Sequence, residues 1–128
     1  MNEVMTIREM CDAFNVTPRT LRFYEAKELL FPIREGQKRL FTKRDRARLT
    51  LILRGKKFDF SLEEIRQLLD LYKDEDGGEA QMRETLKAYH VKLAEMEAQK
   101  QALLRVMADL ENEIAFVEGQ IEGLKRDG

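Results

Sequence analysis

Apolar residues in the first 72 positions recur at helical spacing behind residues that cap helices. Thr6 with Glu9, and Ser61 with Glu64, have the spacing of a capping box. Thr17 is followed by Pro18, which suits the first position of a helix. The pattern therefore predicts four helices, which begin after Thr6, Thr17, Thr42 and Ser61, with the second running from Arg19 to about Leu29 and the fourth reaching Tyr72.

The segment between the second and third predicted helices has the signature of a small hairpin. Residues 31–41 place apolar residues on both sides of Glu35-Gly36, and Gly36 supplies the positive φ that a tight turn needs. Lys38 and Arg39 follow on the distal strand and project positive charge. Only residues 15–17 separate the first two helices, which is the short turn of a helix-turn-helix. The order of helix, turn, helix, basic hairpin and helix is that of a winged helix-turn-helix.

A second pattern begins after the acidic segment Asp74–Glu79, the only predicted linker. Apolar residues then recur in alternating steps of four and three, which is typical of a coiled coil. A helix roughly 60 Å long cannot bury this stripe against the head alone, so a partner helix is required. The chain is therefore divided into a winged helix-turn-helix head, residues 1–75, and a dimerisation helix, residues 76–128. The stripe consists of Met82, Leu86, Tyr89, Leu93, Met96, Lys100, Leu103, Met107, Leu110, Ile114, Val117, Ile121 and Leu124.

Charges beside this stripe favour an antiparallel homodimer. An antiparallel alignment that pairs stripe positions whose numbers sum to 203 stacks all twelve positions from Met82 to Ile121. Among the flanking residues, Lys92 then lies near Glu113 of the second copy and Arg83 near Glu118. A parallel pair in register instead sets Glu113 against Glu118, which repels. Each exposed pair contributes only a few tenths of a kcal/mol, so the preference is modest.

Charge is distributed unevenly along the 128 residues. Residues 1–60 carry 14 Lys or Arg against 8 Asp or Glu, whereas residues 61–128 carry 9 against 16. A basic head on an acidic tail favours a polyanion-binding module joined to a second element, although an unevenly charged solvated surface is an equal alternative on charge alone. One cysteine excludes a disulfide framework, and no apolar run is long enough to span a membrane. A cytoplasmic protein is therefore expected.

Five short segments of the head occur in an order and spacing specific to one family. They are Thr6–Met10, Val16–Glu25, Leu29–Leu30, Lys38–Phe41 and Phe60–Ile65, of which Thr-Leu-Arg-Phe-Tyr-Glu at 20–25 is the most specific. Together they span about residues 5–72, over half the chain, and resemble the MerR-type transcriptional regulators. Residues 34–39 and 51–57 look most like the short subgroup that regulates branched-chain amino acid and acyl-CoA catabolism.

Two positions depart from the family pattern. The wing usually reads Arg-x-Tyr, whereas Phe41 here removes a hydroxyl that could reach a phosphate. A glycine commonly precedes the Phe60–Ile65 segment, but here the residue is Asp59, beside a second wing expected at Gly55–Lys57.

The resemblance implies a mainly α protein, with a winged helix-turn-helix followed by a long antiparallel dimerisation helix. It further implies a homodimer that binds an inverted repeat in a promoter and distorts the DNA between the half-sites. Arg19 is the first candidate for a base-edge contact, because an early-helix guanidinium can fork onto guanine. The candidate DNA-binding residues are Thr17, Pro18, Arg19, Thr20, Arg22, Phe23, Tyr24, Lys38, Arg39, Arg54, Lys56 and Lys57, and the candidate dimerisation residues are the apolar stripe from Met82 to Ile121.

Packing is the alternative role for several of these side chains. Tyr24 can place its ring on the core with its hydroxyl in water. A core position is favoured for Phe14, Leu21 and Phe23, and Cys11 is expected to be a small buried hydrophobe. A solvated helix face is expected for Arg44, Arg46 and Arg48.

The implied partners are double-stranded DNA, a second copy of the chain and RNA polymerase at the promoter, with an inducer left unidentified. No cofactor, metal or membrane is expected, and the sequence lacks the residue patterns of an enzyme active site. The alternative function is that of a coiled-coil interaction or architectural protein, whose basic head binds proteins or anionic surfaces without a specific operator.

Overall fold

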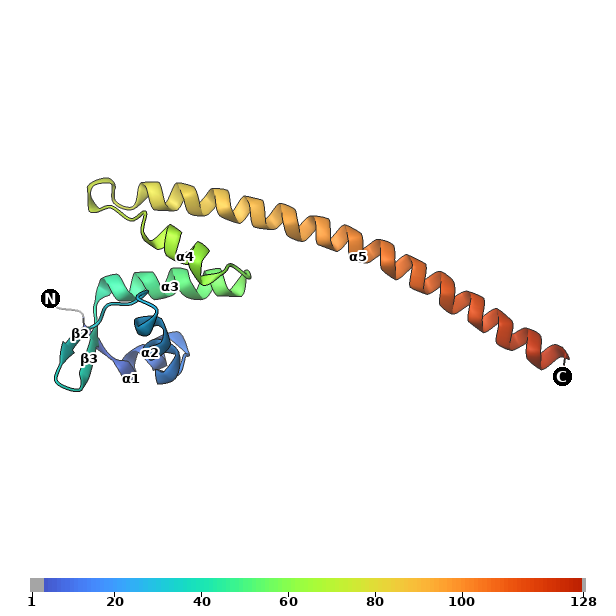
Figure 1. Ribbon diagram of the computed structural model, residues 1–128, viewed down its shortest axis with the longest axis horizontal. Coiled ribbons are helices and arrows are strands. Elements are labelled where there is room, and N and C mark those ends of the chain that lie inside the picture. Colours follow the sequence, from blue (N-terminus) through green and yellow to red (C-terminus); the bar gives the residue numbers. More distant parts are fainter. Residues whose placement is uncertain (1–3, 128) are drawn as a thin grey trace. The chain divides into compact units, whose positions relative to one another are not determined.

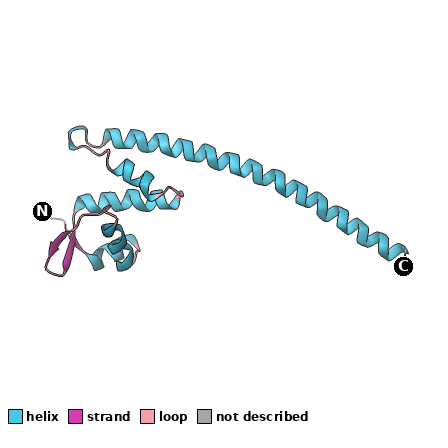
Figure 2. Cartoon of the chain, in the orientation of Figure 1, coloured by secondary structure: helices cyan, strands magenta, loops and turns pink. Residues whose placement is uncertain are grey.

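The computed structural model describes residues 4–127 and confirms a mainly helical chain with a small sheet (Figures 1 and 2). Two compact units divide at Thr85 and Leu86, and the boundary falls inside the last helix. The elements are β1 (Met5–Thr6), α1 (Ile7–Phe14), α2 (Pro18–Ala26), β2 (Ile33–Glu35), β3 (Lys38–Phe41), α3 (Lys43–Lys57), α4 (Leu62–Leu69), a 3₁₀ turn (Asp74–Asp76) and α5 (Glu79–Asp127).

All four predicted helix starts are confirmed with the expected capping hydrogen bonds. The side chains of Thr6, Thr17, Thr42 and Ser61 each accept a bond from a backbone N–H three residues later. Three of the four are complete capping boxes, because the acidic residue at the third helical position returns a bond to the cap. The helix-turn-helix of α1 and α2 is thus set by local sequence.

The predicted ends of two helices are wrong. The second helix ends at Ala26 rather than near Leu29, because Glu28 adopts a left-handed φ of 60° and Leu29 N–H donates back to Tyr24 O at 2.9 Å. This turn sends Leu29 into the core instead of continuing the helix axis. The fourth helix likewise ends at Leu69, before Tyr72.

The predicted hairpin forms and gains a strand that the pattern did not indicate. The strand order is β1-β3-β2, with both pairs antiparallel. Met5 lies opposite Phe41, and Arg34 lies opposite Arg39. β1 has two residues, too short for an alternating pattern to be visible in the sequence.

One apolar core holds the elements of the first unit together. It is formed by Met10, Leu21, Tyr24, Leu29, Leu30, Phe41, Leu49, Ile52, Phe60, Ile65 and Leu69. Because the Phe41 ring is completely buried, the aromatic residue at this wing position supports the core.

The expected second wing at Gly55–Lys57 does not form, because these residues complete the last turn of α3. Gly55 is buried where α3 meets α4, and a Cβ at this position would lie 2.7 Å from Ile65 Cγ1. Asp59 follows with a positive φ of 67°, which is the conformation that glycine adopts most easily. The family preference for glycine at this position therefore has a backbone cause.

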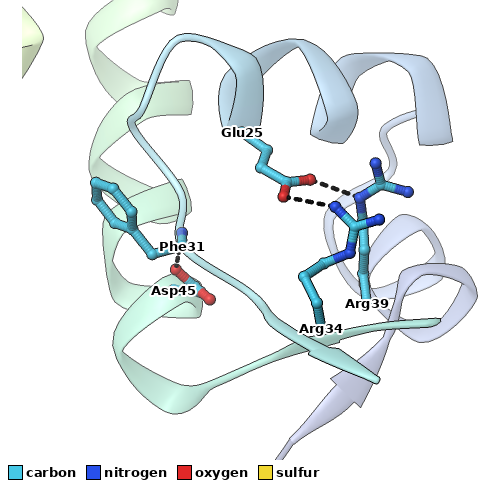
Figure 3. Close-up of polar contacts among 5 residues, drawn as sticks. All are labelled: Glu25, Phe31, Arg34, Arg39 and Asp45. Atoms are coloured by element: carbon cyan, nitrogen blue, oxygen red, sulfur yellow. Dashed lines mark hydrogen bonds and ion pairs between the residues drawn. The ribbon is translucent and has the colours of Figure 1, made fainter. Parts of the chain in front are cut away.

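Asp45 joins the first turn of α3 to the segment between α2 and the hairpin. Asp45 is 2% exposed, and its carboxylate accepts a bond from Phe31 N–H at 2.9 Å (Figure 3). It accepts a second bond from Thr42 N–H at 3.3 Å. Next to it, Arg48 Nε donates to Leu29 O at 2.7 Å. The connection between α2 and β2 is thereby fixed to α3 at two points.

Helix α5 has no buried residue along its described length. Apart from the half-buried Tyr89, the apolar members of the predicted stripe are between 38% and 73% exposed. In the described part of the chain, no helix has the length and apolar character needed to cross a membrane.

Replacing Asp45 with alanine is expected to destabilise the head by about 2–4 kcal/mol, because the change removes a cap and leaves the Phe31 N–H without its acceptor. Glu64→Ala is the matched control, since Glu64 holds the same capping position but is exposed. The Glu64→Ala substitution should lower the free energy of unfolding, measured by chemical denaturation, by only about 1 kcal/mol. Equal losses for the two variants would contradict the joining role of Asp45.

Gly55→Ala is expected to destabilise the head by about 1–3 kcal/mol, because the new methyl group meets the buried Ile65 side chain. Gly119→Ala is the control, since a Cβ there has no neighbour within 4 Å and alanine favours the helix. The midpoint temperature of thermal unfolding should therefore fall for Gly55→Ala and rise for Gly119→Ala. A Gly55→Ala protein as stable as the parent would show that this packing is loose.

Candidate nucleic-acid interface

Helix α2 presents a polar face outward and an apolar face to the core. Pro18, Arg19 and Arg22 are exposed, whereas Leu21 and Tyr24 are buried. This division follows from helical periodicity, which places residues three apart on one face. Arg19 and Arg22 are therefore accessible to a ligand from outside the domain.

Thr17 and Thr20 set the start of this face. Thr20 N–H donates to Thr17 Oγ1 at 3.1 Å, and the two hydroxyl oxygens lie 2.9 Å apart. Both residues are thus engaged in the helix cap. The N-terminal end of a helix attracts anions, which suits an approach to phosphates.

Two aromatic residues of α2 differ in burial. Phe23 is 46% exposed, so the expectation that it lies in the core is wrong; the ammonium of Lys27 lies 5.6 Å from its ring centre. Tyr24 is only 7% exposed, as in the packing alternative for its ring, and burial raises the pKa of its hydroxyl. Phe23, rather than Tyr24, offers an aromatic surface beside the arginines.

Glu25 links α2 to the wing, and the sequence interpretation missed this role. Its carboxylate accepts from Arg39 Nε at 2.5 Å and from Arg34 Nη1 at 3.3 Å (Figure 3). Lys38, between the two arginines, is exposed. The wing thus carries three cations, of which Glu25 holds two at a fixed position beside the recognition helix. Since residues 17–57 contain only four acidic residues, each of these was a candidate for such a contact.

Arg66 of α4 supports the other end of α2. Its guanidinium donates to the backbone carbonyl oxygens of Lys27 and Glu28. These carbonyls belong to the turn that ends α2, so α4 fixes the turn from outside the helix-turn-helix.

The last turn of α3 carries a second basic surface. Arg54, Lys56 and Lys57 are all exposed there, at the helix end where positive charge is favoured. Arg44 is exposed as expected, and Arg46 is half-buried. For Arg48 the expected solvated face is wrong, because this residue is 9% exposed and lies 5.1 Å from the Phe31 ring centre.

Cys11 is half-buried rather than fully buried as expected. Burial and the neighbouring Asp12 raise the pKa of its thiol, while Arg22 lowers it, so the net direction favours the uncharged thiol. Among residues 4–127, no three His, Cys, Asp or Glu side chains are grouped in a way that could hold a metal ion.

An exposed basic helix beside a basic hairpin, on a helix-turn-helix scaffold, defines a DNA-binding protein of the winged helix-turn-helix class. Residues 5–72 match the family described as MerR HTH family regulatory protein, and residues 46–113 match the one described as MerR, DNA binding. The chain belongs to the MerR family of transcriptional regulators.

Named relatives and solved structures agree with this assignment. The chain is 33% identical to the HTH-type transcriptional regulator ZntR of Escherichia coli K12, covering 78% of this chain and 76% of the relative. It is 32% identical to the regulator HmrR of Rhizobium leguminosarum bv. viciae, covering 84% and 82%. A MerR-family regulator from Bacillus cereus has a similar structure, with a TM-score of 0.63, 27% identity, and 86% and 79% of the two chains covered. HiNmlR, a MerR-family regulator lacking the sensor domain and bound to promoter DNA, has the same fold, with a TM-score of 0.58, 24% identity, and 91% and 87% covered.

Glu25→Gln is expected to weaken DNA binding about fivefold, because Arg34 and Arg39 lose the carboxylate that positions them. Net charge alone predicts the opposite, since the variant is one unit more positive per head. Glu35→Gln, which removes the same charge from an exposed position of the hairpin, is the control and should bind DNA slightly more tightly. Fluorescence anisotropy with labelled duplex measures both; tighter binding by Glu25→Gln would refute the positioning role.

Proposed function

We propose that this MerR-family regulator acts as a homodimer on an inverted-repeat promoter site and controls catabolic genes. The observation that carries the proposal is the pairing of a basic recognition surface with a helix whose apolar stripe is unburied within its own chain. One surface reads a half-site, and the stripe brings a second copy of that surface. Two copies related by a two-fold axis match an inverted repeat.

The exposed stripe supports dimerisation on physical grounds. Each large apolar side chain that leaves water contributes about 1.5–3 kcal/mol, and the stripe has eleven members from Met82 to Ile121 besides Lys100. Lys100 forms an ion pair with Glu97 of its own helix at 3.8 Å, so its charge can stay at the edge of an interface. The antiparallel arrangement remains a prediction from charge placement.

Within each head, the residues divide between positioning and reading. Lys38, Arg39 and the exposed end of α3 would hold phosphates, which gives affinity without sequence information. Arg19 and Arg22 would reach base edges in the major groove. Distortion of the DNA between the half-sites would then change the shape of the promoter to which RNA polymerase binds.

The catabolic assignment rests on residues 34–39 and 51–57, which resemble the regulators of branched-chain amino acid and acyl-CoA catabolism. In the structure these segments are the hairpin and the C-terminal half of α3, which are both parts of the basic surface. The resemblance in these segments therefore concerns the DNA sequence that the protein would bind. It does not identify an inducer.

Arg22→Ala tests the recognition surface directly. We expect specific DNA binding to be lost while the helicity and the dimer mass stay unchanged, because the Arg22 side chain is exposed on α2. The parent protein should lose about 10³-fold or more in affinity between 50 and 200 mM salt, if the two heads contact six to ten phosphates. Unchanged binding by Arg22→Ala, measured by gel shift alongside sedimentation, would overturn the assignment of α2.

Reading and positioning residues should respond differently to substitution. Arg19→Ala is expected to cost about 1–3 kcal/mol per head on the operator and little on mismatched DNA, so that specificity falls. Lys56→Ala should weaken binding to operator and mismatched DNA equally. It should also lower the slope of log affinity against log salt concentration by about one per head. Titrations of operator and scrambled duplex at several salt concentrations separate these patterns. If Arg19→Ala lost the same affinity for both duplexes, Arg19 would be a phosphate contact rather than a base contact.

A further inference from the structure

A cavity of about 440 Å³ lies in the first unit, where α3 meets the end of α4 and the first turns of α5. Residues 43, 44, 47, 48 and 51 line it from α3, at the spacing of one helix face. The volume is within the range of sites that bind small molecules. None of its lining residues belongs to the proposed DNA-binding or dimerisation sets.

Positive charge predominates in the lining. Lys43, Arg44 and Arg48 contribute three cations, and Asp74 is the one carboxylate that lines the cavity. Tyr72 also lines it, and a hydrogen bond to Asp74 raises the pKa of the phenol, which stays neutral at neutral pH. The cavity therefore carries a net charge of about +2, which favours an anionic ligand.

Of the three cations, Arg48 also serves the fold, because its Nε donates to Leu29 O at 2.7 Å, whereas Lys43 and Arg44 are exposed. Lys43 and Arg44 occupy the first turn of α3, where the helix dipole disfavours positive charge. Burial and the charge of Arg44 both lower the pKa of Arg48, although Asp70 and Asp45 act in the opposite direction. The buried carboxylate of Asp45 is already bonded to two backbone N–H groups. An anion in the cavity would relieve the repulsion between these cations.

The remaining lining is apolar. Ala47 and Leu51 from α3, Leu69 from α4 and the ring of Tyr72 form this part. An inorganic phosphate or the backbone of DNA would gain nothing from such a wall. A ligand with a charged end and a hydrocarbon body would use both parts of the cavity.

We infer that this cavity is a binding site for an amphipathic organic anion, a carboxylate with an aliphatic body. The carboxylate pairs with Arg44, Lys43 and Arg48, and the aliphatic body packs against Leu51 and Leu69. A regulatory role for this site rests on the proposed function. Gln81 of α5 also lines the cavity, and its Nε2 donates to Leu68 O at 3.1 Å, so a bound ligand touches both the basic helix α3 and the start of α5.

Calorimetry on the full-length protein without DNA tests the site. The probe is octanoate, compared with octanamide, which has the same body without the charge, and acetate, which has the charge without the body. Octanoate should bind about tenfold or more tightly than either of the other two compounds. Octanamide loses the charge-assisted interaction and acetate loses the apolar body, and each loss accounts for at least that factor. Equal binding of octanoate and octanamide, or no binding of octanoate at millimolar concentration, would overturn the inference.

Variants locate the binding. Ala47→Phe fills the cavity from an exposed helical position, and Arg44→Gln removes an exposed cation. Each should weaken octanoate binding about tenfold, whereas the matched controls on α5, Ala98→Phe and Arg105→Gln, should bind it like the parent. Loss of binding in the controls, or parental binding by Ala47→Phe, would place the ligand elsewhere.

A final measurement separates the site from its regulatory role. Saturating octanoate should change operator affinity by about fivefold or more in the parent and not in Ala47→Phe. If octanoate binds as expected but operator affinity does not move, the regulatory role is overturned and the site stands. If the protein binds no operator at all, the proposed function fails while the calorimetry still decides the site.

Discussion

The arrangement of the DNA-binding surface depends on how the first turn of α3 holds the segment between α2 and the wing. Asp45 accepts the backbone N–H of Phe31, and Arg48 donates to the carbonyl of Leu29. A short turn with a left-handed residue at Glu28 would otherwise leave α2 free to move relative to the hairpin. With this segment fixed, Glu25 reaches Arg34 and Arg39, and α2 and the wing form one surface.

The two parts of the chain use the hydrophobic effect differently. The first unit buries an apolar core within the chain, and apart from the buried Arg48 its cations are exposed or half-buried. Helix α5 keeps its apolar stripe exposed and carries an excess of acidic residues. This exposed stripe supports the proposed pairing with a second copy, which would add stability and would match an inverted repeat.

The sequence was informative where the determinants are local. Caps at Thr6, Thr17, Thr42 and Ser61 and the turn at Gly36 act within a few residues, and the four helix starts and the hairpin formed as predicted. The α5 stripe likewise lies on a helix. The early end of α2, the short strand β1 and the burial of Arg48 could not be predicted in this way. The end of α2 depends on a left-handed backbone at Glu28, a residue type that does not signal such a turn. Strand β1 and the burial of Arg48 depend on contacts between residues far apart in the sequence, such as Met5 with Phe41 and Arg48 with the Leu29 carbonyl. The role of Glu25 was missed for the same reason.

The central claim is that two copies of the basic surface read an inverted repeat. Selection of bound fragments from genomic DNA of the host, at near-physiological salt, tests it most directly. The recovered fragments are expected to share a palindromic site in promoters, with half-sites spaced for two heads on one face of the duplex. Recovery of fragments without a common sequence would contradict it and would make the head a non-specific polyanion-binding module.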